Sequence, residues 1–207
     1  MKAVSIDKET INTMPRVTFP GRIHVINAIS QVKSAVTALR TAGVVGFDTE
    51  TRPCFKRGER HNAALIQLST DTDAFLFRVN MTGIPDYLKD FLEDPNCIKV
   101  GLSTGDDFHQ LSRLTDIHPD GFIELQQLVQ EFEITDMSLQ KIYAILFQQK
   151  ISKSQQLTNW EAAELTEAQQ SYAAIDAWAC LRIYDYLKDG NFDPSKSPYY
   201  HELIEMQ

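Results

Sequence analysis

The fold is decided by residues 44–79, where three apolar segments are separated by short polar connections. Residues 44–47 (VVGF) predict a short buried strand that ends at the acidic triplet 48–50 (DTE). Residues 63–68 (AALIQL) and 74–79 (AFLFRV) predict two further strands, and the Ser, Thr and Asp residues between them predict a turn. Because these connections leave little room for a helix, we expect the three strands to be antiparallel neighbours.

Outside this stretch, strands and helices alternate along the chain. The expected strands cover residues 22–26 and 97–102, an apolar segment covers 122–129, and the expected helices cover about 28–41, 85–93, 105–115, 138–147 and 166–188. A meander followed by this alternation predicts an α/β fold with a mixed sheet of five or more strands, flanked by helices. We expect a single domain over residues 1–207, with a core of about 22–188 between a flexible N-terminal lead-in and a flexible C-terminal tail.

The composition excludes several classes of protein. The 207 residues are 43% hydrophobic and 23% charged, which is close to the globular average and argues against disorder, collagen-like repeats and coiled coil. No apolar run approaches the roughly 18 residues that span a bilayer, and the N-terminus lacks the apolar core of a signal peptide. Three cysteines without a CxxC pair indicate reduced thiols, so we expect a cytoplasmic protein without membrane contact.

The charge balance is acidic, with 20 Lys and Arg against 28 Asp and Glu and a net charge of −8. This argues against a protein that holds nucleic acid by bulk charge. It does not exclude one that binds nucleic acid through metal ions.

Asp48 and Glu50 end the first strand of the meander. At i, i+2 spacing on a strand, both side chains lie on one face, where they repel unless a cation or a shared proton relieves them. The alternative is an ordinary polar turn, because a D-x-E triplet is expected about once by chance in a chain of this composition.

A second acidic position lies in the last expected helix. Its apolar stripe consists of Tyr172, Ile175, Ala179, Ile183 and Tyr186. Asp176 lies within that stripe, on the same face as Tyr172. An ionised carboxylate there costs several kcal/mol unless a positive group meets it. An Arg partner would be sufficient, but together with Asp48 and Glu50 a shared metal is the more economical explanation.

The third acidic position is the pair Asp106-Asp107, at the start of the helix expected over 105–115. Asp107 shares a helical face with Leu111 and Leu114 and is expected to point inward. Asp106 shares its face with polar residues and is expected to be a solvated charge near the helix N-terminus. The spacing therefore favours Asp107 as the functional acid.

Taken in order, VVGFDTE, ALIQLS, KVGLSTGDDFHQL, TNW and YAAID resemble the DEDD 3′–5′ exonucleases. The similarity is to the Tyr-containing subclass, which includes ribonuclease D and the Werner-helicase exonuclease group, and it covers roughly residues 22–188. It implies a ribonuclease H-like fold, with Asp48 and Glu50 in the first block, Asp107 in the second, and Tyr172 and Asp176 in the third.

Four carboxylates suit two Mg²⁺ or Mn²⁺ ions, which prefer oxygen ligands. By resemblance, Asp48 bridges both ions, Glu50 and Asp176 complete one site, and Asp107 holds the second ion through water. Tyr172 has an ordinary pKa of about 10 and is a poor base at neutral pH. We expect it to orient the attacking water; the alternative is a core aromatic residue with a satisfied hydroxyl group.

Substrate contacts are expected in the basic stretch after the first acidic block. The candidates are Arg52, Phe55, Lys56, Arg57 and Arg60, together with Lys153 farther along the chain. The alternative for the basic stretch is a solvated loop. The sequence also departs from the family, because relatives commonly carry an Arg where this chain has Gln156 or Leu157. We therefore expect phosphate binding to be weaker or to be supplied by residues elsewhere.

The sequence therefore predicts an enzyme, a metal-dependent 3′–5′ exonuclease that hydrolyses phosphodiester bonds at single-stranded or frayed 3′ ends and releases nucleoside monophosphates. One alternative is a catalytically weak or inactive nucleic-acid-binding member of the same fold. A second is a phosphatase of the haloacid-dehalogenase type, whose D-x-D-x-T motif the residues 48–51 superficially resemble. Glu50 in place of the second Asp, and the YAAID helix, argue against the phosphatase.

Overall fold

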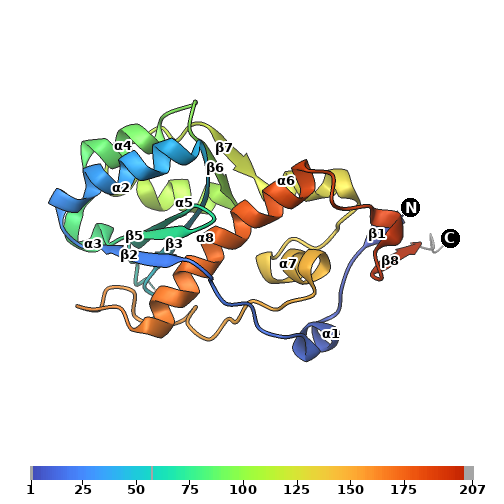
Figure 1. The fold of residues 1–207 in the computed structure, drawn as a ribbon. Coiled ribbons are helices and arrows are strands. Elements are labelled where there is room, and N and C mark those ends of the chain that lie inside the picture. The colour runs from blue at the N-terminus through green and yellow to red at the C-terminus, as the bar shows by residue number, and fades with distance from the viewer. Residues whose placement is uncertain (1, 57, 203–207) are drawn as a thin grey trace.

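A computed structural model of the chain describes residues 2–56 and 58–202, and its centre is a mixed six-stranded sheet (Figure 1). In order across the sheet, the strands are β2 (Arg22–Ile26), β5 (Asp73–Phe77), β4 (Ala63–Ser69), β3 (Val44–Thr51), β6 (Ile98–Gly101) and β7 (Phe122–Glu124). The β3–β4–β5 meander is antiparallel, as its short connections predict. The outer strands β2, β6 and β7 pair in parallel with their neighbours. The predicted α/β class and mixed sheet are confirmed.

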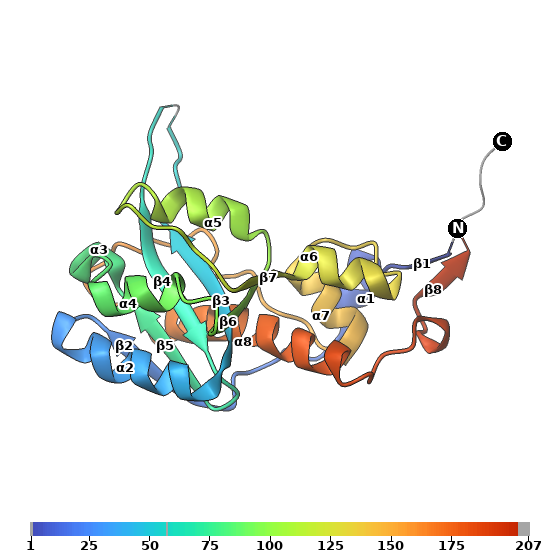
Figure 2. The same ribbon diagram turned by 90° about the horizontal axis from the view of Figure 1, so that it is seen from above.

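Helices cover both faces of this sheet. The helical segments are α1 (Lys8–Thr13), α2 (Ile29–Ala42), α3 (Val79–Thr82), α4 (Asp86–Leu92), α5 (Thr104–Leu111), α6 (Leu125–Leu128), η1 (Val129–Phe132), α7 (Leu139–Phe147), α8 (Glu167–Lys188) and η2 (Pro194–Lys196). One core cluster joins α2, α4 and α5 to the sheet face that carries Phe47. The long helix α8 crosses the opposite face, and Figure 2 shows the layers from above.

The long helix begins where its sequence predicts. The side chain of Thr166 accepts a hydrogen bond from the backbone N–H of Gln169, and the Gln169 side chain accepts one from the backbone N–H of Thr166. This reciprocal capping box satisfies N–H groups that a helix start leaves unpaired. Within the described residues, no helix is long and apolar enough to cross a membrane.

The N-terminal segment differs from the expected flexible lead-in. Strand β1 (Lys2–Val4) pairs with β8 (Tyr200–Glu202), which brings the two ends of the described chain together. The buried side chains of Val4, Ile6 and Ile11 join the core cluster around α7 and α8. Apolar contacts with distant elements order this segment despite its polar, proline-containing sequence. The extent of the domain over residues 1–207 stays a prediction.

Candidate active site

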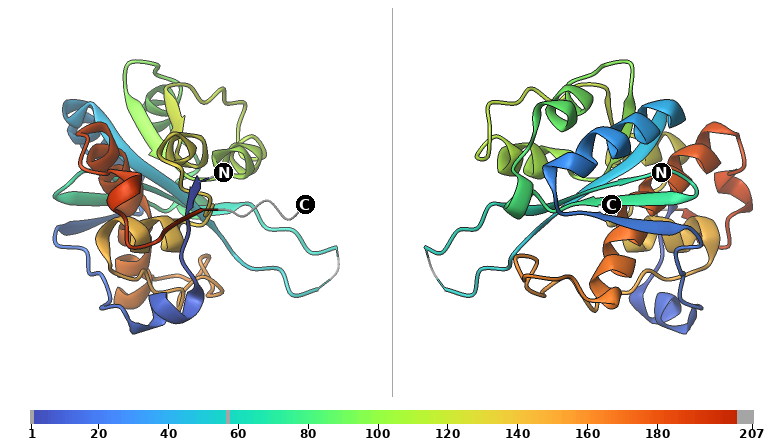
Figure 3. Two further views of the ribbon diagram at one scale, coloured as in Figure 1. Left: turned by 90° about the vertical axis from the view of Figure 1, so that its right-hand side faces the viewer. Right: turned by 60° about the vertical axis from the view of Figure 1, so that its left-hand side comes forward.

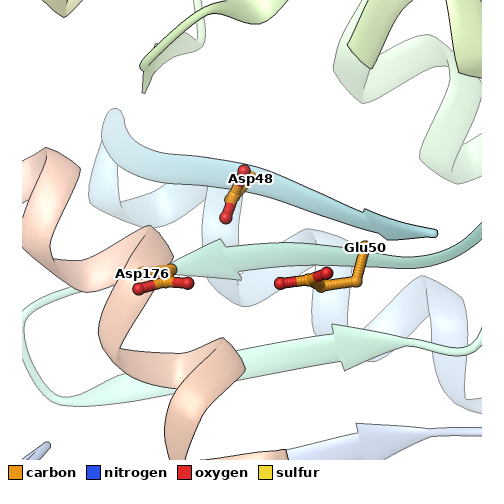
Figure 4. Close-up of side chains that lie close together, drawn as sticks. All are labelled: Asp48, Glu50 and Asp176. Atoms are coloured by element: carbon orange, nitrogen blue, oxygen red, sulfur yellow. The ribbon is translucent and has the colours of Figure 1, made fainter. Parts of the chain in front are cut away.

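Three carboxylates from two elements meet on the α8 side of the sheet. Asp48 and Glu50 project from β3, and Asp176 projects from the middle of α8 (Figure 4). Each residue offers a carboxylate oxygen, and these oxygen atoms all lie within 4.8 Å of one another. Asp176 is buried, with 6% of its surface exposed, whereas Asp48 and Glu50 are half-buried. The i, i+2 spacing on β3 therefore aims both acids at the helix that carries the third.

A glycine allows this close approach. A Cβ atom at Gly46, two residues before Asp48, would lie 1.8 Å from the backbone oxygen of Ala177. Any larger residue would push α8 away from β3. Because Ala177 directly follows Asp176, the absence of a side chain at Gly46 sets how near the helix acid comes to the strand acids.

The cluster carries carboxyl groups whose charge no neighbouring side chain of the described residues balances by an ion pair. In the described part of the chain, none of the three carboxylates forms an ion pair with Lys, Arg or His. Burial, followed by repulsion from the neighbouring acids, raises the pKa of Asp48 well above its ordinary value and that of Glu50 to about 9. Burial also raises the pKa of Asp176 to about 7, although the charge of Lys153 opposes this. An Arg partner for Asp176 is thus absent from the described residues, and the oxygen donors fit Mg²⁺ or Mn²⁺.

The fourth predicted acid lies beside this cluster rather than within it. Asp107, on α5, accepts a hydrogen bond from the Thr49 hydroxyl group, and burial raises its pKa to about 7. Thr49 lies between Asp48 and Glu50 and points to the other face of β3. Asp107 is half-buried and Asp106 is exposed, which agrees with the helical-face argument.

The start of α5 is fixed by a residue that sequence reasoning missed. The Glu124 carboxylate, at the end of β7, accepts hydrogen bonds from the backbone N–H groups of Ser103, at 3.0 Å, and Thr104, at 2.8 Å. Ser103 has a left-handed φ of 60°. The placement of Glu124 directly after an apolar strand resembles that of Asp48 and is the one signal that indicates it. Thr49, hidden between two acids, gives no such signal.

Tyr172 lies one helical turn before Asp176, so the two side chains are on the same face of α8. Burial raises the Tyr172 pKa, so the hydroxyl group stays neutral and can donate. The Trp160 ring packs against Tyr172, with 6.0 Å between the ring centroids. The phenol ring is therefore packed against an aromatic residue and lies one helical turn from a site carboxylate.

These groups face a cavity of about 400 Å³. The lining includes Asp48, Glu50, Tyr172 and Asp176. The rest of the lining includes the apolar residues Leu102, Met137, Leu139 and Ile151, the thiol of Cys180, and the polar residues Lys153 and Gln156. The cavity is thus lined both by the carboxylate cluster and by apolar side chains.

Of the predicted substrate contacts that the structure describes, Lys153 alone lines this cavity. Arg52 forms an ion pair with Glu161 at 3.3 Å. Phe55, with 77% of its surface exposed, belongs to the β3–β4 connection, which projects from the body of the protein (Figure 3). Lys56 and Arg60 are exposed in the same connection, and Arg57 lies outside the described residues.

A protein-family model described as 3′–5′ exonuclease matches residues 23–190. The chain belongs to this 3′–5′ exonuclease family. It is 32% identical over 186 residues to the mouse bifunctional 3′–5′ exonuclease/ATP-dependent helicase WRN, a match that covers 85% of this chain and 13% of the relative. The resemblance to the Werner-helicase exonuclease and ribonuclease D group is confirmed.

Solved structures agree with this family assignment. Escherichia coli RNase D superimposes with a TM-score of 0.71 at 25% identity, covering 81% of this chain and 44% of that chain. The Nibbler EXO domain of Aedes aegypti has a TM-score of 0.72 at 22% identity, covering 84% and 92%. The predicted ribonuclease H-like fold of the exonuclease family is confirmed, and the phosphatase alternative finds no support.

This exonuclease-family chain spans only part of its curated relatives. It covers 13%, 66% and 30% of the mouse WRN protein, an Arabidopsis thaliana 3′–5′ exonuclease and a Drosophila melanogaster exonuclease domain-containing protein.

Proposed function

We propose that the chain is a metal-dependent 3′–5′ exonuclease that hydrolyses phosphodiester bonds at single-stranded or frayed 3′ ends and releases nucleoside monophosphates. The observation that carries this proposal is the cluster of Asp48, Glu50 and Asp176, whose oxygen atoms lie within 4.8 Å without an ion-pair partner in the described chain. Asp48, Glu50 and Asp176 would hold one Mg²⁺ or Mn²⁺ ion, and Asp48 and Asp107 a second. Bound in this way, the two ions would activate water and neutralise the leaving 3′ oxygen.

The residues around the carboxylates support the same reaction. The neutral Tyr172 hydroxyl group is suited to hydrogen-bond and orient a water molecule rather than to remove its proton. Lys153 faces the cavity and supplies a positive charge for a phosphate group. The cavity of about 400 Å³ suits a single terminal nucleotide, with its base against the apolar residues of the lining.

The projecting β3–β4 connection supports an accessory role in binding the strand. Phe55 is exposed and can stack on a base, and Lys56 and Arg60 are exposed and can meet phosphates. We include Arg52 and Arg57 in this contact as proposals, although Arg52 must exchange its ion pair with Glu161 to take part. All three cysteines are free thiols, in keeping with a cytoplasmic location, which we also propose.

Degradation of end-labelled oligonucleotides tests the proposal. One single-stranded oligonucleotide is labelled at the 5′ end and an identical one at the 3′ end, and each is incubated with Mn²⁺ or with a chelator. We expect a ladder of shortened products from the 5′ label, a labelled mononucleotide from the 3′ label, and neither with chelator.

Two variants complete the experiment. Asp176→Asn should abolish the ladder, whereas Asp106→Asn, on the exposed side of α5, should leave it intact. Binding of the oligonucleotide without shortening would favour the alternative of an inactive nucleic-acid-binding member. Internal cuts would contradict exonuclease action.

A further inference from the structure

The side chain of Gln67, at the centre of β4, is buried without a partner. None of its surface is exposed, and among the described residues neither its Nε2 nor its Oε1 atom has a hydrogen-bond partner. A buried amide that makes no hydrogen bond is unfavourable, and buried side-chain polar atoms in native proteins are in large majority paired. We therefore expect the Gln67 amide to have a hydrogen-bond partner.

The register of the sheet identifies the nearest carboxylate. Gln67 is the direct cross-strand partner of Asp48 in the antiparallel β3–β4 pair. Directly opposed side chains lie on the same face of a sheet, with Cβ atoms about 4.5–5.5 Å apart. Gln67 is therefore on the face covered by α8, next to the first acid of the site.

The other neighbours of Gln67 offer little to an amide. Its partner on β5 is Leu76, an apolar side chain. Ser69, the next residue of β4 on the same face, already donates its hydroxyl hydrogen to the backbone oxygen of Thr70. Asp48 is thus the acceptor that the sheet places beside the unpaired amide.

We propose that Gln67 is a positioning residue, which donates a hydrogen bond from Nε2 to the Asp48 carboxylate when that carboxylate binds a divalent cation. A carboxylate has more lone pairs than one cation uses, and ligating carboxylates are themselves held by hydrogen bonds. The amide fixes the direction in which the Asp48 oxygen atoms point. This inference rests on cation binding in the proposed function and not on the reaction.

The test is the binding of Mn²⁺ alone to the full chain, measured by isothermal titration calorimetry. Gln67→Met keeps the length of the side chain and removes the donor, and Gln67→Leu provides a second variant without a donor. The matched control is Ser69→Ala, which changes a buried polar residue of the same strand, opposite Gly46 rather than Asp48. Melting temperatures without metal are recorded for all four proteins.

We expect Gln67→Met and Gln67→Leu to weaken Mn²⁺ binding by about 10-fold, the lower end of the effect of removing an outer partner of a metal ligand. Ser69→Ala should stay within about twofold of the wild type. The metal-free melting temperature of Gln67→Met should equal or exceed that of the wild type, because the variant loses an unpaired buried amide. Damage to packing would lower affinity and melting temperature together.

Two results would overturn the inference. One is Mn²⁺ affinity within twofold of the wild type in whichever Gln67 variant folds, and the other is an equal loss of affinity in Ser69→Ala. A wild-type protein that binds no Mn²⁺ refutes the proposed metal dependence and this inference together. A wild type that binds Mn²⁺ and shortens oligonucleotides, beside a Gln67→Met protein that binds equally well, refutes the inference alone.

Discussion

Replacing Asp176 by asparagine should stabilise the metal-free protein above neutral pH. The substitution keeps the shape of the side chain and one oxygen atom that can accept a hydrogen bond. It removes a carboxyl group that is buried and that no cationic side chain of the described residues pairs with. The prediction opposes the usual expectation that a change at a buried polar residue destabilises.

The magnitude follows from the pKa of Asp176, which burial raises from 3.8 to about 7 in the folded protein. Between these values the native state holds a proton that the unfolded chain releases. The stability from this proton is complete below the unfolded pKa and is lost as the pH rises to about 7. The difference between the two pKa values corresponds to about 4 kcal/mol, and a buried asparagine amide offsets part of this. We expect a net gain of about 2–3 kcal/mol, or roughly 5–10 °C in melting temperature for a chain of this size.

The assay is thermal unfolding of both proteins in chelator at pH 8 and at pH 4.5. The variant should melt above the wild type at pH 8, and the difference should shrink strongly at pH 4.5, where Asp176 is protonated in the folded wild type. With excess Mn²⁺ at pH 8 the order should reverse, because the wild type binds the ion more tightly. A gain of equal size at both pH values, or a loss at pH 8, would refute the assignment of the effect to burial of the Asp176 charge.

Three further predictions concern neighbouring residues. In single-turnover assays, Asp107→Asn should lower the rate of exonucleolytic cleavage by at least about 100-fold, whereas the rate of Asp106→Asn should stay within about twofold of the wild type. The reverse order would contradict the assignment of Asp107 as the second acid. Tyr172→Phe should lower kcat by about 10- to 100-fold with little change in Mn²⁺ affinity by calorimetry, because its proposed role is to orient water. Gly46→Ala should lower the melting temperature by at least about 5 °C, because the added Cβ atom would lie 1.8 Å from the Ala177 backbone oxygen. An unchanged melting temperature would show that α8 can shift freely.

The central elements of the fold are predictable because their signals are local. Apolar segments joined by short connections determine the β3–β5 meander. The Thr166 capping box determines where α8 begins. The N-terminal segment is not predictable in this way. Its order depends on pairing between Lys2–Val4 and Tyr200–Glu202, nearly 200 residues apart in sequence, and on burial of Ile11 near α7. No local pattern encodes a contact of that range.

The site shows the same division between local and non-local information. Asp48 and Glu50 share a strand face, and Asp176 lies in an apolar helical stripe, so each is conspicuous in the sequence alone. Thr49 and Gln67 acquire a place in the site only through register and packing, which bring Thr49 to Asp107 and Gln67 to Asp48. The acidic residues of the cluster can therefore be predicted from the sequence, whereas the neutral residues beside them require the structure.

The rigidity of α8 explains why the acids remain together despite their repulsion. To move Asp176 away from Asp48, the helix would have to lift from β3 and expose fully buried residues such as Ala173 and Ile183. Exposure of apolar core side chains costs about 25 cal/mol for each Å² of surface. Because the interior is close-packed, the helix has no intermediate position of low energy. The repulsion is therefore relieved by protons or by a cation rather than by movement of the backbone. A helix held over Gly46 thus keeps the oxygen atoms of the three carboxylates within 4.8 Å of one another.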